Sequence, residues 1–91
     1  MNWQRFPMYK ATFKKSVLKK LAKLPTQDAI NIFNTITEFL SDPSATKFDT
    51  KKLTDFEGYR LRVGDYRIIY TIDHKAQNID IKNITHRKDA Y

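Results

Sequence analysis

The segment GYRLRVGDYRIIY, residues 58–70, constrains the fold most strongly, because it predicts two antiparallel strands joined by a tight turn. Gly64-Asp65 suits a two-residue turn with glycine in the first position, which pairs residues 59–63 with residues 66–70 in reverse order. Side chains on a strand point alternately to its two faces, so every second residue shares a face. One predicted face is apolar and can meet other elements. It comprises Tyr59, Leu61, Val63, Tyr66, Ile68 and Tyr70.

The opposite face of this hairpin carries three arginines, Arg60, Arg62 and Arg67, with Arg62 directly opposite Arg67. Like charges directly opposite each other destabilise a strand pair. A single arginine on an exposed sheet face is ordinary, and charge there also discourages edge-to-edge aggregation. A purely solvated face, however, would be expected to pair one of the two with Asp or Glu. The unmatched pair therefore favours a surface that meets an anionic group such as a phosphate.

The overall charge supports an anionic partner as well. Seventeen basic residues against ten acidic residues give a formal net charge of +7, which is typical of proteins that bind polyanions. Four of the five arginines lie in the last third of the chain, at positions 60, 62, 67 and 87. Arginine presents a planar fork of donors suited to phosphate, whereas lysine is a hydrated point charge. We therefore expect the lysines to supply general electrostatics and the arginines to form a site.

The composition excludes several classes of protein. The absence of cysteine removes disulfide frameworks, thiol nucleophiles and cysteine-based zinc sites. Two histidines, His74 and His86, are too few for a metal site without carboxylates at ligand spacing, so we expect no metal and no cofactor. No apolar run reaches the ~18–20 residues of a membrane span, and MNWQRFPMYK lacks the apolar core of a signal peptide. We expect a cytoplasmic protein that does not bind membranes.

Apolar periodicity predicts the other elements of a single domain over residues 1–91. A short strand at residues 9–13 precedes a lysine-rich helix through residues 13–24, with Thr12 as its N-cap. Pro25 separates this helix from a second one at about residues 26–41, and the two form an antiparallel helix hairpin. Residues 44–58 are expected to be a loop. The predicted fold is α+β, in the order β-α-α-β-β-β, with an antiparallel sheet and the helix hairpin on one face.

A further strand at residues 78–85 should follow the hairpin as a meander, antiparallel to its second strand. Its C-terminal end then lies beside Arg67. We therefore expect five side chains with donor or proton-transfer chemistry to converge on one end of a concave sheet face. This expectation depends on register, because a shift of one residue moves every side chain to the other face. The five are Arg62, Arg67, His86, Arg87 and Tyr91.

Two segments resemble a known family: KKLTDFEGYRLRVGDYRIIYTID, residues 51–73, and ITHRKDAY, residues 84–91. They resemble the RelE/ParE toxin superfamily, and more specifically its RelE-type mRNA interferases. The similarity extends over nearly the whole chain. ParE-type gyrase inhibitors share much of the hairpin, whereas the hairpin together with the HRKDAY ending is more specific.

The resemblance implies a RelE-like fold and a toxin of a type II toxin–antitoxin system. Such a toxin is a metal-independent endoribonuclease that enters the A site of the 70S ribosome, cleaves mRNA there and inhibits translation. The ribose 2′-OH attacks the adjacent phosphodiester and leaves a 2′,3′-cyclic phosphate and a 5′-OH. The resemblance also implies a cognate antitoxin, a separate chain that wraps the toxin and covers its basic face.

The resemblance also implies roles for individual residues. Arg62 and Arg67 would hold the scissile phosphate and stabilise the charge that grows in the transition state. Arg87 would orient that phosphate and assist the leaving 5′-oxygen. We expect RNA-backbone binding from the remaining basic residues of this region, Arg60, Lys51 and Lys52.

The sequence does not decide whether His86 or Tyr91 is the proton-transfer residue. Relatives tend to carry lysines at the positions of Arg60 and Arg62, and arginine stays protonated, so it is a poor general base. An unperturbed pKa of about 6.5 makes His86 the best-tuned acid or base, and the surrounding positive charge should depress that pKa. Tyrosine at the position of Tyr91 is typically a stacking or proton-transfer residue in the family.

Two other functions fit the sequence. A ParE-like, non-catalytic toxin that binds DNA gyrase needs the same fold but neither His86 nor Tyr91. A plain nucleic-acid-binding module without toxicity needs only the charge, and its binding should fall steeply with salt. The sequence excludes neither alternative.

Overall fold

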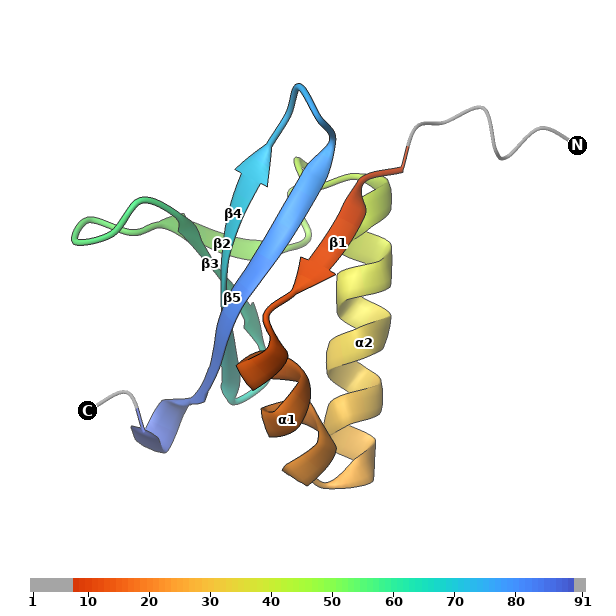
Figure 1. Cartoon of the computed structure of the whole chain (residues 1–91), viewed down its shortest axis with the longest axis vertical. Helices are drawn as coiled ribbons and strands as arrows, with labels where there is room; N and C mark the ends of the chain where they lie inside the picture. Colours follow the sequence, from red (N-terminus) through yellow and green to blue (C-terminus); the bar gives the residue numbers. More distant parts are fainter. Residues whose placement is uncertain (1–7, 90–91) are drawn as a thin grey trace, which may run out of the picture.

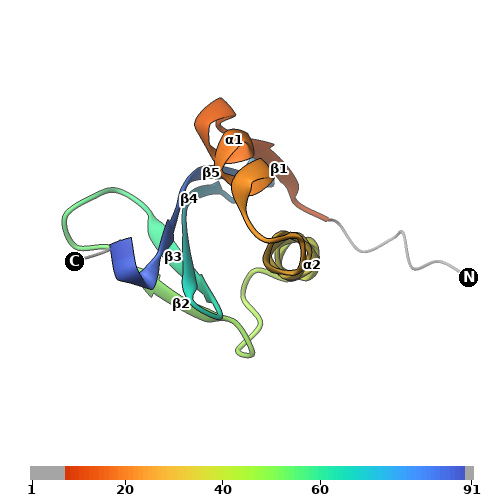
Figure 2. The same cartoon turned by 90° about the horizontal axis from the view of Figure 1, so that it is seen from below.

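The computed structural model describes residues 8–89, which form two α-helices and a five-stranded sheet (Figure 1). The helices are α1 (Lys15–Lys23) and α2 (Thr26–Ser41), and a short 3-10 helix, η2, covers Arg87–Asp89. The strands are β1 (Lys10–Phe13), β2 (Asp49–Lys52), β3 (Tyr59–Val63), β4 (Tyr66–Asp73) and β5 (Asn78–His86). Both α-helices pack on one face of the sheet, as Figure 2 shows. The predicted α+β class with a helix hairpin on one face is confirmed.

The sheet differs from the prediction in two respects. Its order is β1-β5-β4-β3-β2, and β1 pairs with β5 in parallel, so the sheet is mixed rather than antiparallel. The second difference is β2, which lies within the segment expected to be a loop and pairs antiparallel with β3. All four residues of β2 are exposed and polar, so the segment carries no apolar alternation that would have indicated a strand.

The β3–β4 hairpin has the predicted register at every position. Tyr59 pairs with Tyr70, Leu61 with Ile68, and Val63 with Tyr66. Arg62 faces Arg67 directly. Because of this register, the apolar face of the hairpin packs against the helices and the arginines lie on the opposite face.

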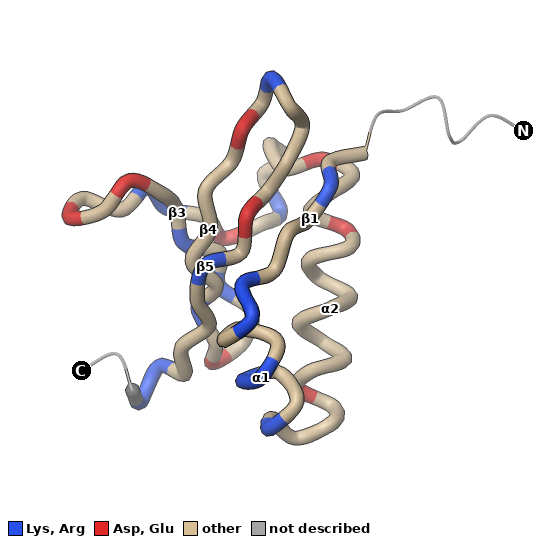
Figure 3. Tube along the Cα trace, viewed as in Figure 1, with Lys and Arg blue, Asp and Glu red and all other residues tan. Residues whose placement is uncertain are grey.

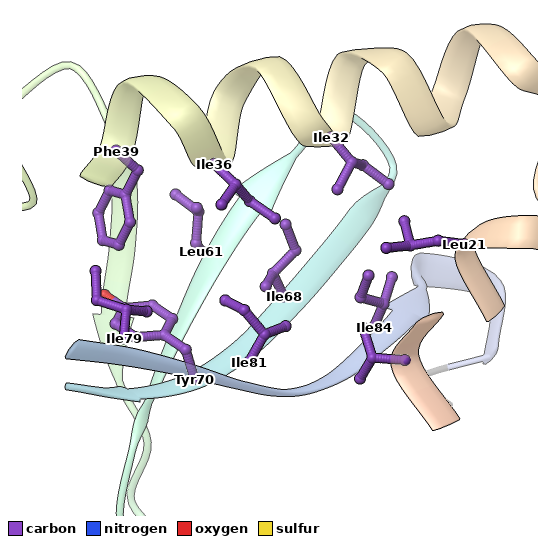
Figure 4. Close-up of a cluster of buried hydrophobic side chains, with 11 residues drawn as sticks. Leu21, Ile32, Ile36, Phe39, Leu61, Ile68, Tyr70, Ile79, Ile81 and Ile84 are labelled. Carbon is purple, nitrogen blue, oxygen red and sulfur yellow. The ribbon is translucent and has the colours of Figure 1, made fainter. Parts of the chain in front are cut away.

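The core fills the space between the helices and the sheet (Figure 4). Each helix contributes residues three or four positions apart, which places them on one face. Full burial of one such side chain contributes roughly 1.5–3 kcal/mol. The buried residues are Val17 and Leu21 of α1, Ile32, Ile36 and Phe39 of α2, and Leu61, Ile68, Tyr70, Ile79, Ile81 and Ile84 of the sheet.

The helices match the prediction closely at α2 and less closely at α1. The observed bounds of α2 are those expected, whereas α1 starts at Lys15 and its N-cap is Lys14, without a side-chain cap. The predicted capping by Thr12 is wrong, because Thr12 belongs to β1 and its hydroxyl donates to Asn78 Oδ1 at 3.1 Å. Between residues 8 and 89, no helix combines the length and the apolar character that a membrane crossing requires.

An irregularity in the pairing of β5 with β4 decides toward which face of the sheet the last side chains of β5 point. Ile69 pairs with Asn83 but Tyr70 pairs with Ile81, so Lys82 is an extra residue, a β-bulge. The bulge reverses the alternation of β5. It allows Ile84 to be buried on the same face as Ile79 and Ile81, although it is three residues beyond Ile81.

Candidate functional site

A concave pocket of about 450 Å³ opens on the sheet face opposite the helices. We call it the arginine pocket. Its walls come from β2, β3, β4 and β5 and from the segment that joins β2 to β3. In Figure 3, Lys and Arg positions recur where these strands lie together and again along α1. The pocket is lined by Lys51, Lys52, Leu53, Thr54, Phe56, Arg60, Arg67, Ile69 and Thr85.

Strand register brings these side chains together from distant parts of the sequence. Lys51 pairs with Arg60, and Arg60 pairs with Ile69, which forms one row across β2, β3 and β4. A second row contains Arg67, which lies between Arg62 on β3 and Thr85 on β5. Arg67 thus lies inside the sheet rather than at an edge, and its basic group opens onto the pocket.

An acidic residue, Asp49, stands beside two of the arginines. The Nη2 atom of Arg60 donates to Asp49 Oδ1 at 3.0 Å, and Arg62 Nη1 lies 3.9 Å from Asp49 Oδ2. The expectation that no acid matches this arginine pair is therefore wrong, because Asp49 lies opposite Arg62 on β2, the strand that the sequence did not indicate. The case for a binding site consequently depends on the pocket rather than on unmatched charge.

The two arginines that contact Asp49 differ in accessibility. The side chain of Arg60 is 20% exposed, and its buried Nε has no hydrogen-bond partner among residues 8–89. The side chain of Arg62 is 46% exposed, and Arg62 is not among the residues that line the pocket. Arg60 is therefore the less exposed of the two and part of the pocket wall, whereas Arg62 lies outside the pocket.

His86 does not join the arginines. It pairs with Tyr66, and its ring meets the Tyr66 ring edge-on at 5.1 Å on the helix side of the sheet. There it lines a second cavity of about 230 Å³ together with Asp28 of α2. The expected convergence is wrong for His86, because the bulge at Lys82 reverses the alternation of β5. The spacing of Ile79, Ile81 and Ile84, two residues and then three, was a readable signal of that bulge.

The surroundings of His86 indicate a structural role. Its Nδ1 atom accepts a hydrogen bond from the backbone N–H of Lys88 at 3.1 Å, which fixes the start of η2. The hydroxyl of Tyr66 donates to Asp28 Oδ2 at 2.8 Å and links β4 to α2. This hydrogen bond, followed by burial and the nearby carboxylates, raises the pKa of Tyr66 above its usual value.

Arg87 is held beside the hairpin turn. Its backbone N–H donates to the carbonyl oxygen of Asp65 at 2.7 Å, and its Nε lies 3.6 Å from Asp65 Oδ1. It therefore lies at the same end of the hairpin as Arg62 and Arg67, although it does not line the pocket. Tyr91, the fifth predicted residue, lies outside the described residues.

Phe56 is a lining residue that the sequence pattern did not indicate. It is 73% exposed and lines the pocket, and it belongs to the segment between β2 and β3. The signal in the sequence was an aromatic residue inside the polar run TDFEG, close to Lys51 and Lys52. Within residues 8–89, no three histidine, cysteine or acidic side chains are grouped so that they could hold a metal ion.

Comparison with known proteins identifies the family. The model of the ParE toxin family, toxins of type II toxin–antitoxin systems, matches residues 11–91. The chain belongs to this toxin family. A putative toxin RelE1 of Methanocaldococcus jannaschii is 34% identical to it over 79 residues, which cover 85% of this chain and 88% of the relative.

Solved structures agree with this assignment. The toxin superposes on the archaeal RelE–RelB complex from Pyrococcus horikoshii OT3 with a TM-score of 0.77 at 30% identity, covering 89% of this chain and 97% of that one. For the RelB–RelE antitoxin–toxin complex from Methanococcus jannaschii the TM-score is 0.71 at 30% identity, covering 88% of this chain and 94% of that one. The predicted membership of the RelE/ParE superfamily is confirmed.

The arginine pocket gives the toxin a surface with two kinds of chemistry. Its charged lining residues, two arginines and two lysines, are all basic, and they offer donors to phosphate oxygens. Leu53, Phe56 and Ile69 add an apolar part. Proteins that bind single-stranded nucleic acid without sequence preference combine cationic groups with aromatic side chains.

Proposed function

We propose that this toxin is a ribosome-dependent endoribonuclease that cleaves mRNA in the A site of the 70S ribosome. The observation that carries the proposal is the arginine pocket, in which Arg60, Arg67, Lys51 and Lys52 surround one concave surface. A surface built only for general attraction would spread its charge, as the lysines of α1 do. The RelE names of the relatives support the same choice.

In the proposed reaction, the 2′-oxygen of a ribose forms a bond to the adjacent phosphorus and the bond from phosphorus to the 5′-oxygen breaks. The products are a 2′,3′-cyclic phosphate and a 5′-OH. Negative charge grows on the phosphate oxygens in the transition state, and fixed cationic donors stabilise it. We assign this role to Arg67 with Arg60, while Arg62 binds a flanking phosphate. Arg87, beside the turn, orients the scissile phosphate and assists the leaving oxygen.

One proton must leave the 2′-OH and another must reach the 5′-oxygen. Arginine stays protonated and cannot accept the first. His86 lies on the helix side, across the sheet from the pocket, and its Nδ1 already accepts the backbone N–H of Lys88. Of the two candidates left open by the sequence, we therefore assign removal of the 2′-OH proton to Tyr91, while solvent water supplies the proton that the 5′-oxygen takes.

We further propose that a cognate antitoxin binds this toxin in the resting cell and covers the basic face. The toxins from Pyrococcus horikoshii and Methanococcus jannaschii that share its fold were solved as complexes with RelB. A negatively charged segment of such a partner would occupy the same donors as the RNA phosphates, so inhibition and catalysis would exclude each other.

The test is induced expression in bacteria, followed by primer extension on a translated reporter mRNA. Wild-type toxin should produce cuts at fixed positions within codons, and Arg67→Ala and Tyr91→Phe should lose most of them. His86→Gln should keep the cuts, because the ring lies on the other face. Lys82→Ala, which also removes one positive charge from the sheet but lies outside the pocket, serves as the matched control.

The second candidate is the one that the sequence left open, a ParE-like toxin that inhibits DNA gyrase, and the ParE name of the matching family supports it. This function predicts growth arrest without mRNA cuts and no effect of Tyr91→Phe on toxicity. Purified toxin would then inhibit gyrase supercoiling directly. A chain that neither arrests growth nor cuts mRNA, but binds RNA in proportion to its charge, would instead be a simple nucleic-acid-binding module.

A further inference from the structure

Phe56 is the most exposed large apolar side chain within residues 8–89. Its side chain is 73% exposed, compared with 55% for Met8 and 42% for Phe33. It lies in the connection between β2 and β3, which extends away from the helices in Figure 1. An aromatic ring in this position contributes little to the core, so folding does not account for it.

The connection that carries Phe56 is closed at its base. The backbone N–H of Leu53 donates to the carbonyl oxygen of Gly58 at 3.0 Å. Gly58 has φ of 147°, a conformation that favours glycine, and a Cβ there would lie 2.9 Å from the carbonyl oxygen of Tyr70. The close contact with β4 fixes the end of the connection at Gly58, two residues after Phe56, which lines the pocket.

Acidic residues flank Phe56 at the tip of the connection, whereas basic residues line the rest of the pocket. Asp55 and Glu57 flank it in the sequence and both are exposed, so a phosphate at the tip of the connection would be repelled. Lys51, Lys52 and the two arginines lie on the remaining walls. A bound nucleotide therefore has one favourable orientation, with its phosphate toward the arginines and its base toward Phe56.

We propose that Phe56 forms a nucleobase subsite in which one base of single-stranded RNA stacks on its ring, beside the phosphate bound by Arg60 and Arg67. The subsite rests on the proposed function, since it assigns that RNA a position. Leu53 and Ile69 supply the apolar surroundings of the base. The pocket volume of about 450 Å³ falls within the range of clefts and cavities that bind small ligands.

The first test measures binding of a fluorescent, single-stranded 2′-O-methyl oligoribonucleotide, in which the nucleophile is blocked, by anisotropy at several salt concentrations. Phe56→Ala should weaken binding roughly 5- to 150-fold, the range for loss of one stacked base. The slope of log K against log salt should not change, because no charge is removed. Arg67→Ala should reduce that slope by about one. Phe33→Ala, an exposed phenylalanine of α2, is the matched control and should bind like wild type.

A second test locates the base. A set of the same oligonucleotides, each with one abasic position, should reveal one position at which the missing base weakens binding to wild-type toxin. The same missing base should not further weaken binding to Phe56→Ala. Phe56→Trp should retain both the affinity and this dependence. Unchanged RNA binding by Phe56→Ala, or an equal loss for every abasic oligonucleotide, would overturn the subsite. The same holds if Phe56→Ala impairs only antitoxin binding.

The subsite and the ribonuclease activity can fail separately. If wild-type toxin produces no cuts in the reporter mRNA but the abasic series behaves as described, the ribonuclease proposal is wrong and the base subsite stands. If cuts appear and Phe56→Ala makes them as efficiently as wild type, with unchanged RNA affinity, the ribonuclease proposal stands and the subsite is wrong.

Discussion

Arg62 can face Arg67 across the hairpin because Asp49, its neighbour on β2, stands on the other side of Arg62. Its carboxylate lies 3.0 Å from Arg60 Nη2 and 3.9 Å from Arg62 Nη1. Attraction to the carboxylate offsets the repulsion between the arginines that the register enforces. The same carboxylate repels a phosphate. Asp49 should therefore stabilise the folded toxin and at the same time weaken RNA binding.

Replacement of Asp49 should separate these two effects. We expect Asp49→Asn to tighten binding of single-stranded RNA and to steepen its salt dependence, since one negative charge leaves the site. The free energy of unfolding should fall by less than about 1 kcal/mol, because the ion pair is partly exposed. Anisotropy titrations and urea unfolding measure the two quantities. Asp80→Asn, which disrupts an ion pair with Lys82 outside the pocket, is the control. Weaker RNA binding by Asp49→Asn would show that Asp49 orients the arginines.

A second prediction concerns the pH dependence of the free energy of unfolding and depends on Tyr70. Burial, with a smaller contribution from Tyr59, raises the pKa of Tyr70 from 10.0 to about 12. Because the folded pKa lies above the unfolded one, the stabilisation is complete below pH 10 and is lost as the pH rises toward 12. The loss amounts to roughly 2–3 kcal/mol. Urea unfolding at rising pH should show a shallower decline for Tyr70→Phe, whose ring cannot ionise. Parallel declines in both proteins would assign the loss to other groups.

At the scale of elements, the sequence predicted the strands whose pairing is determined by a nearby pattern of apolar and turn residues. The β3–β4 hairpin carries an apolar alternation and a glycine turn, and both its bounds and its pairing followed from them. The polar strand β2 has no alternation because all its residues are exposed. The parallel pairing of β1 depends on packing across the whole domain. His86 was placed on the wrong face because one bulge reverses a strand.

The same difference between local and distant determinants applies to the pocket. Arg60 and Arg67 were predicted to share a face because both belong to the hairpin. The ion-pair partner Asp49 was missed because it comes from the strand that was not recognised. Phe56 was missed because an exposed aromatic residue has no periodic pattern, and only the folded connection places it beside the arginines.

Gly58, at the end of the connection between β2 and β3, allows a prediction about the stability of these strands. In Gly58→Ala the new Cβ would lie 2.9 Å from the backbone oxygen of Tyr70, and the residue would keep a φ of 147°. We expect a loss of about 1–3 kcal/mol in the free energy of unfolding, measured with urea. Gly64→Ala is the matched control, since φ is 58° there and no atom lies within 4 Å of the added Cβ. A larger loss for Gly64→Ala would contradict the close packing at Gly58.

At the scale of the whole molecule, the positive charge has two locations with different expected effects. The lysines of α1 recur along that helix (Figure 3), on the side turned away from its buried residues Val17 and Leu21. Lys51 and Lys52 line the arginine pocket on the opposite face of the sheet. Long-range attraction to RNA depends on the total charge and is weakened by salt. Binding in a pocket depends on where each charge lies. The two contributions can be compared because equal numbers of lysines can be removed from each location.

The comparison uses two double variants, Lys15→Ala with Lys19→Ala on α1 and Lys51→Ala with Lys52→Ala in the pocket. Each lowers the formal net charge of +7 by two. The α1 variant should slow association with RNA, mainly at low salt, and leave the pattern of reporter mRNA cuts intact. The pocket variant should lose RNA affinity at all salt concentrations and should reduce the cuts strongly. Stopped-flow association rates and primer extension measure these outcomes. Equal loss of cuts in the two variants would mean that net charge, rather than the arginine pocket, determines the activity.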